Sequence, residues 1–226
     1  MDELVLEGLK NTLPLVPGIN GKNEYFNSAV LVLLLLVDGE YHFVFEKRAA
    51  LIRQAGEICF PGGKFDPEND ANYQDAAVRE TEEELGIGAE KIRVIGPLDT
   101  VIATMGTTVD AFLGILDANC LENLKINLAE VERIFTVPVS YFEKTEPEIY
   151  QVTLEVHPSY VNQAGEEVVT FPAKELGLPD RYYRQWGNVK SNIFVYRVAD
   201  VTIWGITARL IKDVVTRIRS IGKAKS

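Results

Sequence analysis

The chain of 226 residues contains 46% apolar residues, 33 acidic residues and 23 basic residues, which give a formal net charge of −10. This acidity argues against a nucleic-acid surface or an anionic membrane as the main partner. The apolar run at residues 29–37 is too short to cross a bilayer, and residues 1–12 lack the basic start and apolar core of a signal peptide. Cys59 and Cys120 form neither a metal-type pair nor a disulfide framework, which fits a reducing compartment, so we expect a cytoplasmic protein.

The first part of the chain predicts a short helix, a loop and then paired strands. Residues 1–27 carry a weak amphipathic start followed by Pro and Gly. The continuous apolar run at residues 30–37 is typical of a fully buried strand, and the Asp-Gly pair after it favours a hairpin turn into a second strand at residues 41–46. Residues 57–60 predict a further short strand, in which Cys59 is expected to be a small core residue.

The second part of the chain predicts more strands and a closing helix. Residues 158–190 are rich in Pro and Gly and are expected to be irregular. Apolar spacing at residues 203–218 predicts a final helix, opened by a buried Trp204 and by Gly205, which would permit close packing. Without a repeat or a low-complexity linker, we expect a single domain over residues 1–226, α+β in class, with a mixed sheet. The remaining strands are predicted at residues 92–95, 98–104, 109–116, 134–139, 150–156 and 193–198.

An unusual density of acid marks residues 61–87, between a Pro-Gly-Gly loop and Gly86. On a helix, Glu80, Glu83 and Glu84 share one face, where their like charges repel. A divalent cation would reverse that cost, and carboxylates at this spacing suit Mg²⁺ or Mn²⁺. The alternative is a solvated acidic face. Arg79, which can pair with one of the acids, favours the functional interpretation.

The same stretch carries the boundary signals of a helix. Asp70 or Asn72 can cap its start, and Gly86 can supply the left-handed residue that ends it. The face opposite the acids is mostly apolar, so the helix has a core to lie on. That face is formed by Ala77, Val78, Thr81 and Leu85.

Residues 79–87, RETEEELGI, resemble the second half of the Nudix box, although Thr81 stands where the family has a bulky apolar residue. Fifteen residues separate Gly63 from Arg79, instead of the usual thirteen, and Asp70 lies near the place of the first box glutamate. This longer variant is similar to the coenzyme A pyrophosphatase subgroup of the family. Residues 51–64, LIRQAGEICFPGGK, and residues 203–208, IWGITA, also resemble that subgroup, and the resemblance covers about residues 28–215.

The resemblance implies a Nudix fold, in which a mixed β-sheet is sandwiched between α-helices, and a metal-dependent hydrolase. Glu80, Glu83 and Glu84 match the metal ligands, and Arg79 matches the residue that orients them. Glu80, Glu83 and Arg79 are therefore the expected catalytic residues, and Mg²⁺ or Mn²⁺ is the expected cofactor. The general base stays open: Glu83 can serve, as can a loop carboxylate, with Glu130 and Glu132 as candidates. Surface acids before a strand are the favoured interpretation of those two, and His157, also a possible base, is more typical of a structural or surface residue.

The substrate implied by the resemblance is coenzyme A or its acyl esters, split to 3′,5′-ADP and 4′-phosphopantetheine. Gly62, Gly63 and Lys64 would contact the pyrophosphate, and a basic cluster of Lys47, Arg48 and Arg53 would take the 3′-phosphate; the alternative is solvated loop cations. ADP-ribose, or another nucleoside diphosphate compound, is the second substrate hypothesis, and a non-catalytic Nudix binding module is the third. The expected partner is a small nucleotide, with no nucleic acid or membrane, and the chain is a candidate homodimer.

Overall fold

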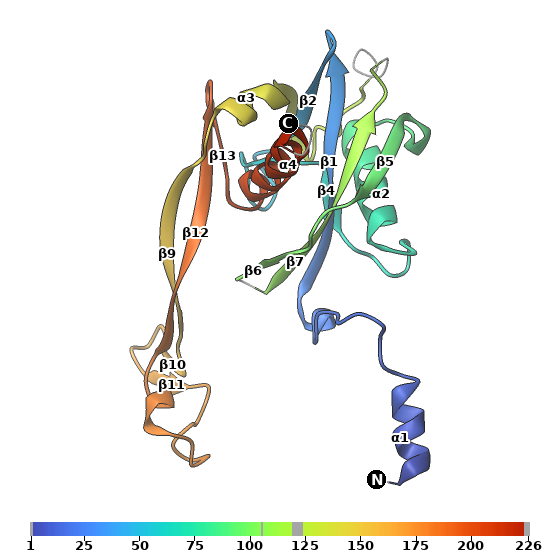
Figure 1. Ribbon diagram of the computed structural model, residues 1–226. Helices are drawn as coiled ribbons and strands as arrows, with labels where there is room; N and C mark the ends of the chain where they lie inside the picture. Colours follow the sequence, from blue (N-terminus) through green and yellow to red (C-terminus); the bar gives the residue numbers. More distant parts are fainter. Residues whose placement is uncertain (1, 105, 119–123, 224–226) are drawn as a thin grey trace.

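The computed structural model describes residues 2–104, 106–118 and 124–223, so Cys120 lies outside the described residues. The α-helices are α1 (Glu3–Lys10), α2 (Tyr73–Leu85), α3 (Val139–Lys144) and α4 (Gly205–Lys223), with 3₁₀ turns at Lys22–Glu24, Ala89–Lys91 and Asp180–Tyr182. The strands, shown in Figure 1, are β1 (Phe26–Val37), β2 (Glu40–Arg48), β3 (Ile58–Cys59), β4 (Gly62–Lys64), β5 (Ile92–Pro97), β6 (Val101–Ala103), β7 (Thr107–Leu116), β8 (Val131–Pro138), β9 (Glu148–Val156), β10 (Ser159–Val161), β11 (Glu167–Val169), β12 (Trp186–Val198) and β13 (Val201–Trp204).

The main sheet is mixed and is built around β1. Its strand order is β3-β2-β1-β7-β5, with β4 also paired to β1, β6 to β7 and β8 to β2. The β1–β7 pair is parallel, whereas β2 and β4 run antiparallel to β1. Helix α2 covers one face of this sheet and α4 covers the other (Figure 1). This arrangement confirms the α+β class and the expected sandwich.

Strand β1 is buried on both faces, as its continuous apolar run predicted. Leu31, Leu33 and their odd-numbered neighbours pack in the core beneath α2, while Val32 belongs to the core beneath α4. Successive side chains of a strand point to opposite faces, so a run without polar interruptions is what a central strand between two helices requires.

An aromatic cluster fills the core on the α4 side. The rings of Phe45 and Phe60 lie 4.9 Å apart, and those of Phe142 and Tyr196 lie 5.0 Å apart in an edge-to-face arrangement. These residues come from β2, from the chain next to β3, from α3 and from β12, so the cluster joins the main sheet to the smaller β13-β12-β9 sheet around α4. Edge-to-face rings add stabilisation beyond the apolar area that they bury.

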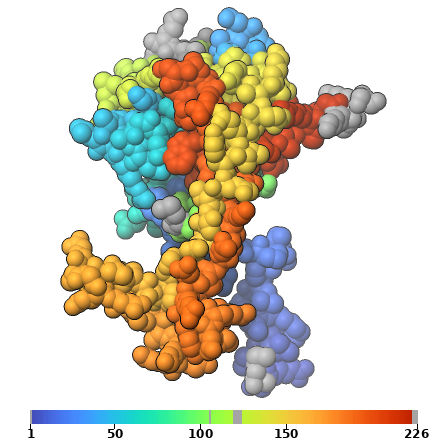
Figure 2. Space-filling view, turned by 90° about the vertical axis from the view of Figure 1, so that its left-hand side faces the viewer, coloured from blue at the N-terminus to red at the C-terminus, as the bar shows by residue number. Residues whose placement is uncertain are grey.

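Strands β9 and β12 form a long two-stranded arm that leaves the body. Their pairing runs from Glu148↔Val195 to Trp186↔Val156, and β10 and β11 form a hairpin at its tip. Figure 2 shows the arm in orange and the N-terminal segment in blue, both projecting from the same end of the molecule. The prediction of irregular structure for residues 158–190 is therefore wrong at β10, β11 and the start of β12. Frequent Pro and Gly obscure the pattern of strands this short.

Two further predictions are corrected at the C-terminal helix. Trp204 is the last residue of β13, opposite Val195, and is 45% exposed rather than buried. Gly205 opens α4 with a φ of +64°, and an added Cβ would meet nothing within 4 Å, so the residue serves backbone conformation instead of close packing. Helix α4 thus begins at Gly205 and not at Ile203. Among the described helices, none combines the length and the apolar composition needed to cross a membrane.

The strand predicted at residues 98–104 is also shorter than expected. Only Val101–Ala103 pairs with β7 as β6, whereas Leu98 hydrogen-bonds to the Ala111 carbonyl through its backbone N–H at 2.8 Å, just beyond the end of β5. The chain therefore changes direction between β5 and β6 within one apolar stretch, which periodicity alone does not reveal.

Candidate active site

The Gly62–Gly63 loop lies in close contact with β1 on one side and with the acidic helix α2 on the other. Gly62 has a φ of +147°, and a Cβ there would lie 2.3 Å from the Ala29 carbonyl oxygen. A Cβ on Gly63 would lie 2.3 Å from the carboxyl carbon of Glu80. Gly62 is thus required by the backbone of β1, and Gly63 leaves room for the Glu80 carboxylate against the loop while β4 pairs with β1.

Helix α2 begins and ends where the sequence signals indicate. Asn72 is its N-cap and accepts hydrogen bonds from the backbone N–H groups of Gln74 and Asp75. Gly86 ends the helix with a φ of 64°. Of the two predicted caps, Asn72 is correct, because the Asp70 carboxylate is used elsewhere.

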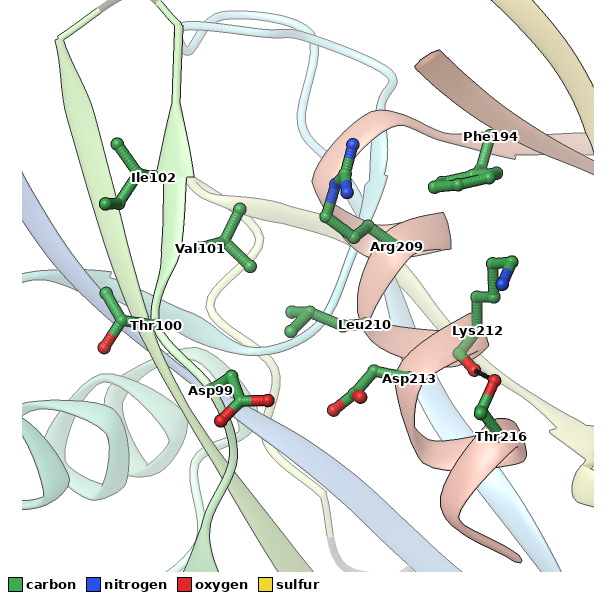
Figure 3. Close-up of a pocket in the computed structure, with 10 residues that line it drawn as sticks. All are labelled: Asp99, Thr100, Val101, Ile102, Phe194, Arg209, Leu210, Lys212, Asp213 and Thr216. Carbon is green, nitrogen blue, oxygen red and sulfur yellow. Dashed lines mark hydrogen bonds between the residues drawn. The ribbon is translucent and has the colours of Figure 1, made fainter. Parts of the chain in front are cut away.

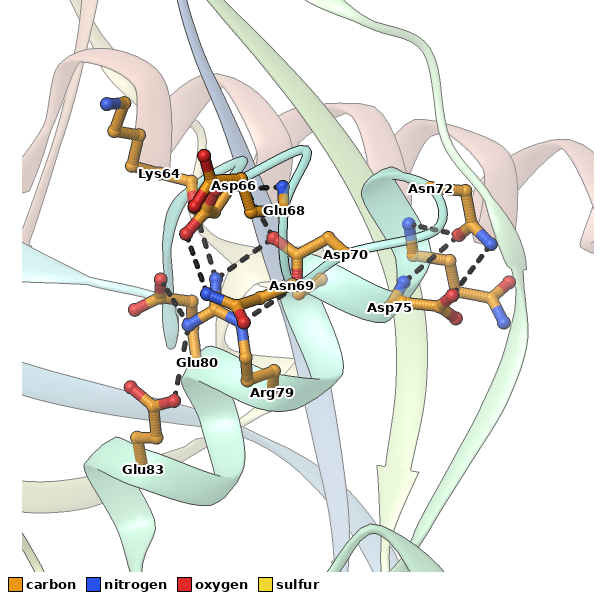
Figure 4. Close-up of polar contacts among 12 residues, drawn as sticks. Lys64, Asp66, Glu68, Asn69, Asp70, Asn72, Asp75, Arg79, Glu80 and Glu83 are labelled. Carbon is orange, nitrogen blue, oxygen red and sulfur yellow. Dashed lines mark hydrogen bonds and ion pairs between the residues drawn. The ribbon is translucent and has the colours of Figure 1, made fainter.

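Arg79 is the centre of the site (Figure 4). Its Nε and Nη2 donate to the two carboxylate oxygens of Asp70 at 2.8 and 3.0 Å, and Nη2 also donates to the Lys64 carbonyl at 3.2 Å. Nη1 pairs with Glu80 at 2.8 Å and with Glu83 at 3.3 Å. The Arg79 guanidinium holds the pKa of the buried Asp70 carboxyl below its usual range. The expected orienting role of Arg79 is thus matched by contacts to two of the three predicted metal ligands.

The acidic side chains differ in exposure along the helix. Glu83 is more than half exposed, whereas Glu80 is largely buried and its pKa is raised by that burial. Thr81, the departure from the family pattern, is fully buried, and its hydroxyl donates to the Ala77 carbonyl at 2.7 Å. The helix therefore satisfies the threonine hydroxyl internally, and the residue can occupy an apolar position.

Glu84 points into the protein, toward the sheet. Its side chain is buried and its Oε2 accepts a hydrogen bond from the Gly62 backbone N–H at 2.8 Å. Burial, and then the neighbouring Glu46 carboxylate, raise the pKa of Glu84 to about 9. The Gly-Gly loop and the acidic helix are therefore linked twice, through Glu80 and through Glu84.

Glu46 on β2 lies beside the acidic helix, which the sequence analysis did not anticipate. It is 1% exposed, and burial raises its pKa to about 7. Its Oε1 accepts a hydrogen bond from the Cys59 thiol at 3.4 Å, whereas its Oε2 has no partner. The sequence does contain a signal for this residue. Side chains two positions apart in a strand point to the same face, so Glu46 faces the same core as Val44, which lies beneath α2. Cys59 is correspondingly half-buried beside Glu46, and not a small residue within the apolar core.

Two of the predicted basic residues already have partners within the protein. Lys47 pairs with Glu132 at 2.7 Å, and the Nε of Arg48 donates to the Arg53 carbonyl at 3.1 Å. The side chains of Arg53 and Lys64 are exposed, and neither forms an ion pair within the described part of the chain. Arg53 and Lys64 are therefore two exposed cations available to an anionic ligand.

The candidate bases outside the box fall in different places. Glu132 is already paired with Lys47, and His157 is an exposed residue at the end of the arm, 3.5 Å from Glu155. Glu130 is exposed, and its negative charge contributes to the raised pKa of Glu80 and Glu46. Of the three, Glu130 is the one that the fold brings toward the box.

A hollow of 510 Å³ lies on the other side of the sheet, between α4 and the segment containing β6 (Figure 3). Arg209 and Lys212 of α4 line it together with Asp99 and Val101. Because α2 covers the opposite face of the sheet, this hollow does not belong to the site around Arg79.

Comparison with known proteins identifies the family. The NUDIX domain model matches residues 26–176, and the chain belongs to the Nudix family. It is 41% identical to Nudix hydrolase 3 of Caenorhabditis elegans over 118 residues, which cover 50% of this chain and 48% of that protein. It is 32% identical over 142 residues to the peroxisomal coenzyme A diphosphatase NUDT7 of Mus musculus, covering 62% of this chain and 56% of that protein.

Further matches agree with these two. The mitochondrial coenzyme A diphosphatase NUDT8 of Mus musculus is 35% identical over 125 residues, covering 54% of this chain and 59% of that protein. The chain thus spans about half the length of the curated relatives it matches, and two of them carry the subgroup name that the sequence resemblance indicated. The crystal structure of a MutT/nudix family protein from Enterococcus faecalis shares the fold, with a TM-score of 0.50, 13% identity and coverage of 97% of this chain and 70% of that one.

The donor set around Arg79 suits a divalent ion in its chemistry. Carboxylate oxygens are the ligands that Mg²⁺ and Mn²⁺ prefer, and Glu80, Glu83 and Glu84 lie within one helical turn. In the part of the chain that the structure describes, no three acidic, His or Cys side chains converge closely enough to hold an ion. Glu80 and Glu83 are instead paired with Arg79.

Proposed function

We propose that the protein is a Nudix pyrophosphohydrolase that uses Mg²⁺ or Mn²⁺ to cleave coenzyme A or acyl-coenzyme A to 3′,5′-ADP and (acyl-)4′-phosphopantetheine. The observation that supports the chemistry best is the arrangement of acids around one fixed guanidinium. Arg79 is anchored by the buried Asp70 and contacts Glu80 and Glu83, while Glu84 is held by the Gly-Gly loop.

Each side chain has a defined task in this proposal. A bound divalent ion would supply charge neutralisation for the pyrophosphate and a water of lowered pKa. Arg79 restricts the side-chain conformations of Glu80 and Glu83, so these ligands are ordered before the ion arrives. Glu83, which is exposed, and Glu130, which approaches from the loop before β8, are the alternatives for the base that takes the proton of the attacking water.

The choice of coenzyme A rests on similarity and on free cations. Two relatives are named coenzyme A diphosphatases, and residues 51–64 resemble the signature of that subgroup. The 3′-phosphate that distinguishes coenzyme A needs a positive partner, which the exposed Arg53 and Lys64 can provide. ADP-ribose is the alternative substrate, since it offers the same pyrophosphate without the 3′-phosphate. A binding module without activity is a remote alternative, because Glu80, Glu83 and Glu84 are all present.

A substrate panel tests the proposal. The purified full chain is incubated with Mg²⁺ or Mn²⁺ and with coenzyme A, dephospho-coenzyme A or ADP-ribose, and the products are identified by mass spectrometry. We expect 3′,5′-ADP and 4′-phosphopantetheine from coenzyme A, and none when the metal is chelated. Much faster hydrolysis of ADP-ribose would overturn the substrate assignment alone, whereas no cleavage of any compound would favour the binding module.

We also propose that the protein is a homodimer, with the arm as its contact surface. Ile149, Tyr150 and Val152 of β9 are each about half exposed, and an isolated two-stranded ribbon is marginally stable in water. Light scattering over a range of protein concentrations tests this, and a monomer at all concentrations would contradict it.

The expected cytoplasmic location stays a prediction for cell fractionation, since the relatives above are named peroxisomal and mitochondrial. With a net charge of −10, we expect no binding to nucleic acid or anionic vesicles.

A further inference from the structure

One buried oxygen stands out near the proposed metal site. Among the buried side-chain nitrogen and oxygen atoms that the structure describes, Glu46 Oε2 is the one without a hydrogen-bond partner. A buried polar atom left unpaired costs about 1–3 kcal/mol, so such atoms are rare in native proteins. The absence of a partner therefore points to a ligand that binds this oxygen.

The backbone holds Glu46 in place. β2 pairs on one side with β3, where Glu46 lies opposite Cys59, and on the other side with β8, where it lies opposite Ile134. The Cys59 thiol holds Oε1 at 3.4 Å. The strand that carries Glu46 is thus paired on both sides and the Oε1 atom has a partner. Only Oε2 is left for a further contact.

Glu46 faces the acidic helix. It lies on the α2 side of the sheet, next to Glu84, and its negative charge raises the pKa of Glu84. Glu84 uses Oε2 to bind the Gly62 N–H. Arg48 partly offsets the negative charge of both, but its Nε donates to the Arg53 carbonyl. Two buried carboxyl groups are therefore side by side with no cation bound directly between them in the described part of the chain.

We propose that Glu46 is an additional ligand of the divalent cation, supplied from the sheet rather than from the box helix. Its Oε2 would bind the ion together with Glu84, whose position is fixed by the Gly-Gly loop. This inference rests on the proposed metal site and adds a ligand to it. An oxygen-preferring ion would satisfy the unpaired Oε2 and would allow both buried carboxyl groups to be ionised side by side.

The experiment measures Mn²⁺ binding directly, by electron paramagnetic resonance on the purified full chain without substrate. Wild type is compared with Glu46→Gln, which keeps the shape, and with Glu46→Asp, which keeps the charge but shortens the reach. Glu40→Gln is the matched control, since Glu40 is an exposed residue of the same strand and the charge change is equal. We expect the Kd for Mn²⁺ to rise at least about tenfold in both Glu46 variants and to stay within about twofold in the control.

Thermal unfolding without and with Mn²⁺ separates ligation from a structural role. Without metal, Glu46→Gln should melt no lower than wild type, because the amide keeps the shape and removes a buried group whose charged form is costly. With metal, its melting temperature should rise less than that of wild type. If Glu46→Gln or Glu46→Asp binds Mn²⁺ as tightly as wild type, this inference is overturned, whatever the melting temperature. The proposed metal site on the box helix would still stand. If wild type itself does not bind Mn²⁺, the proposed metal site and this inference both fail.

Discussion

The guanidinium of Arg79 donates hydrogen bonds to both carboxylate oxygens of Asp70, nine residues earlier in the chain, at 2.8 and 3.0 Å. The Asp66 backbone N–H donates to the same carboxylate at 2.8 Å, so Asp70 ties the loop before α2 to the helix. This contact gives the aspartate of the longer loop a defined partner on the helix. The loop folds back on itself so that a short acidic side chain meets Arg79 from the side opposite Glu80.

Asp70→Asn should destabilise the protein by about 3 kcal/mol at pH 7. Removal of one partner from a buried ion pair costs about 3–5 kcal/mol, and the lower end applies here because Arg79 keeps its contacts with Glu80 and Glu83. Chemical denaturation measures the change. Glu68→Gln, an exposed position in the same loop, is the control and should stay within about 0.5 kcal/mol.

The same variant should show a defined pH dependence. The pKa of Asp70 is lowered in the folded state, below its ordinary value of 3.8, so its ion pair contributes stability above that value. The contribution is lost as the pH falls through the folded-state pKa. Melting temperatures of wild type and Asp70→Asn should therefore differ at pH 7 and converge below about pH 4. A difference that stays constant down to pH 3 would show that the ion pair is not the source.

Gly63→Ala should impair catalysis through Glu80. The added Cβ would lie 2.3 Å from the Glu80 carboxyl carbon, so the carboxylate must move, and a displacement of about 1 Å in an active site costs about a hundredfold in rate. Gly96→Ala in β5 is the matched control, because its Cβ would meet nothing within 4 Å. Steady-state kinetics on both variants test this, and equal rates would show that the loop has room to adjust.

Glu83→Gln and Glu84→Gln should each keep the fold and lose activity by about a hundredfold or more. Each change removes a charged ligand while the shape is kept, and metal-assisted charge stabilisation contributes several kcal/mol. In Glu84→Gln the amide oxygen can still accept the Gly62 N–H, so stability should not fall. Rates are measured at saturating Mg²⁺. Wild-type turnover in both variants would contradict the metal assignment.

The parts of the fold that could be predicted are those set by local chemistry. The uninterrupted apolar run gave β1 its two buried faces, and Asn72 and Gly86 bounded α2 because capping depends on residues within one turn. The acidic face of α2 follows from spacing alone. Its link to Asp70 does not, since either Asp70 or Asn72 satisfies the local capping rule and only the folded loop decides between them.

What could not be predicted depends on contacts between distant segments. Glu46 belongs to the site because β2 lies beside β3 and faces α2, and neither neighbour is evident from the residues around it. The basic cluster was inferred from closeness in sequence, yet Lys47 pairs with Glu132, 85 residues away. Strand β12 begins seven residues before the apolar run at 193–198, because it pairs with β9 through exposed positions that carry no burial pattern.

Trp204→Ala should cost only about 1 kcal/mol, because the ring at the end of β13 is 45% exposed. For a chain of this size that is a fall of about 2–4 °C in melting temperature. Phe142→Ala is the comparison, since Phe142 is fully buried in the aromatic cluster and should cost about 3–5 kcal/mol. Equal losses in the two variants would indicate that Trp204 is covered in solution, for instance by a second copy of the chain.

Arg53→Ala should reduce the preference for coenzyme A over dephospho-coenzyme A. If Arg53 binds the 3′-phosphate, wild type should favour coenzyme A by about ten- to a hundredfold in kcat/KM, the range of one charge-assisted contact. The variant should lose most of this ratio by slowing coenzyme A, while dephospho-coenzyme A is cleaved as before. Arg93→Ala is the control, since Arg93 is an exposed cation on β5, at the sheet edge opposite β3. An unchanged ratio in Arg53→Ala, with a reduced one in Lys64→Ala, would transfer the phosphate contact to Lys64.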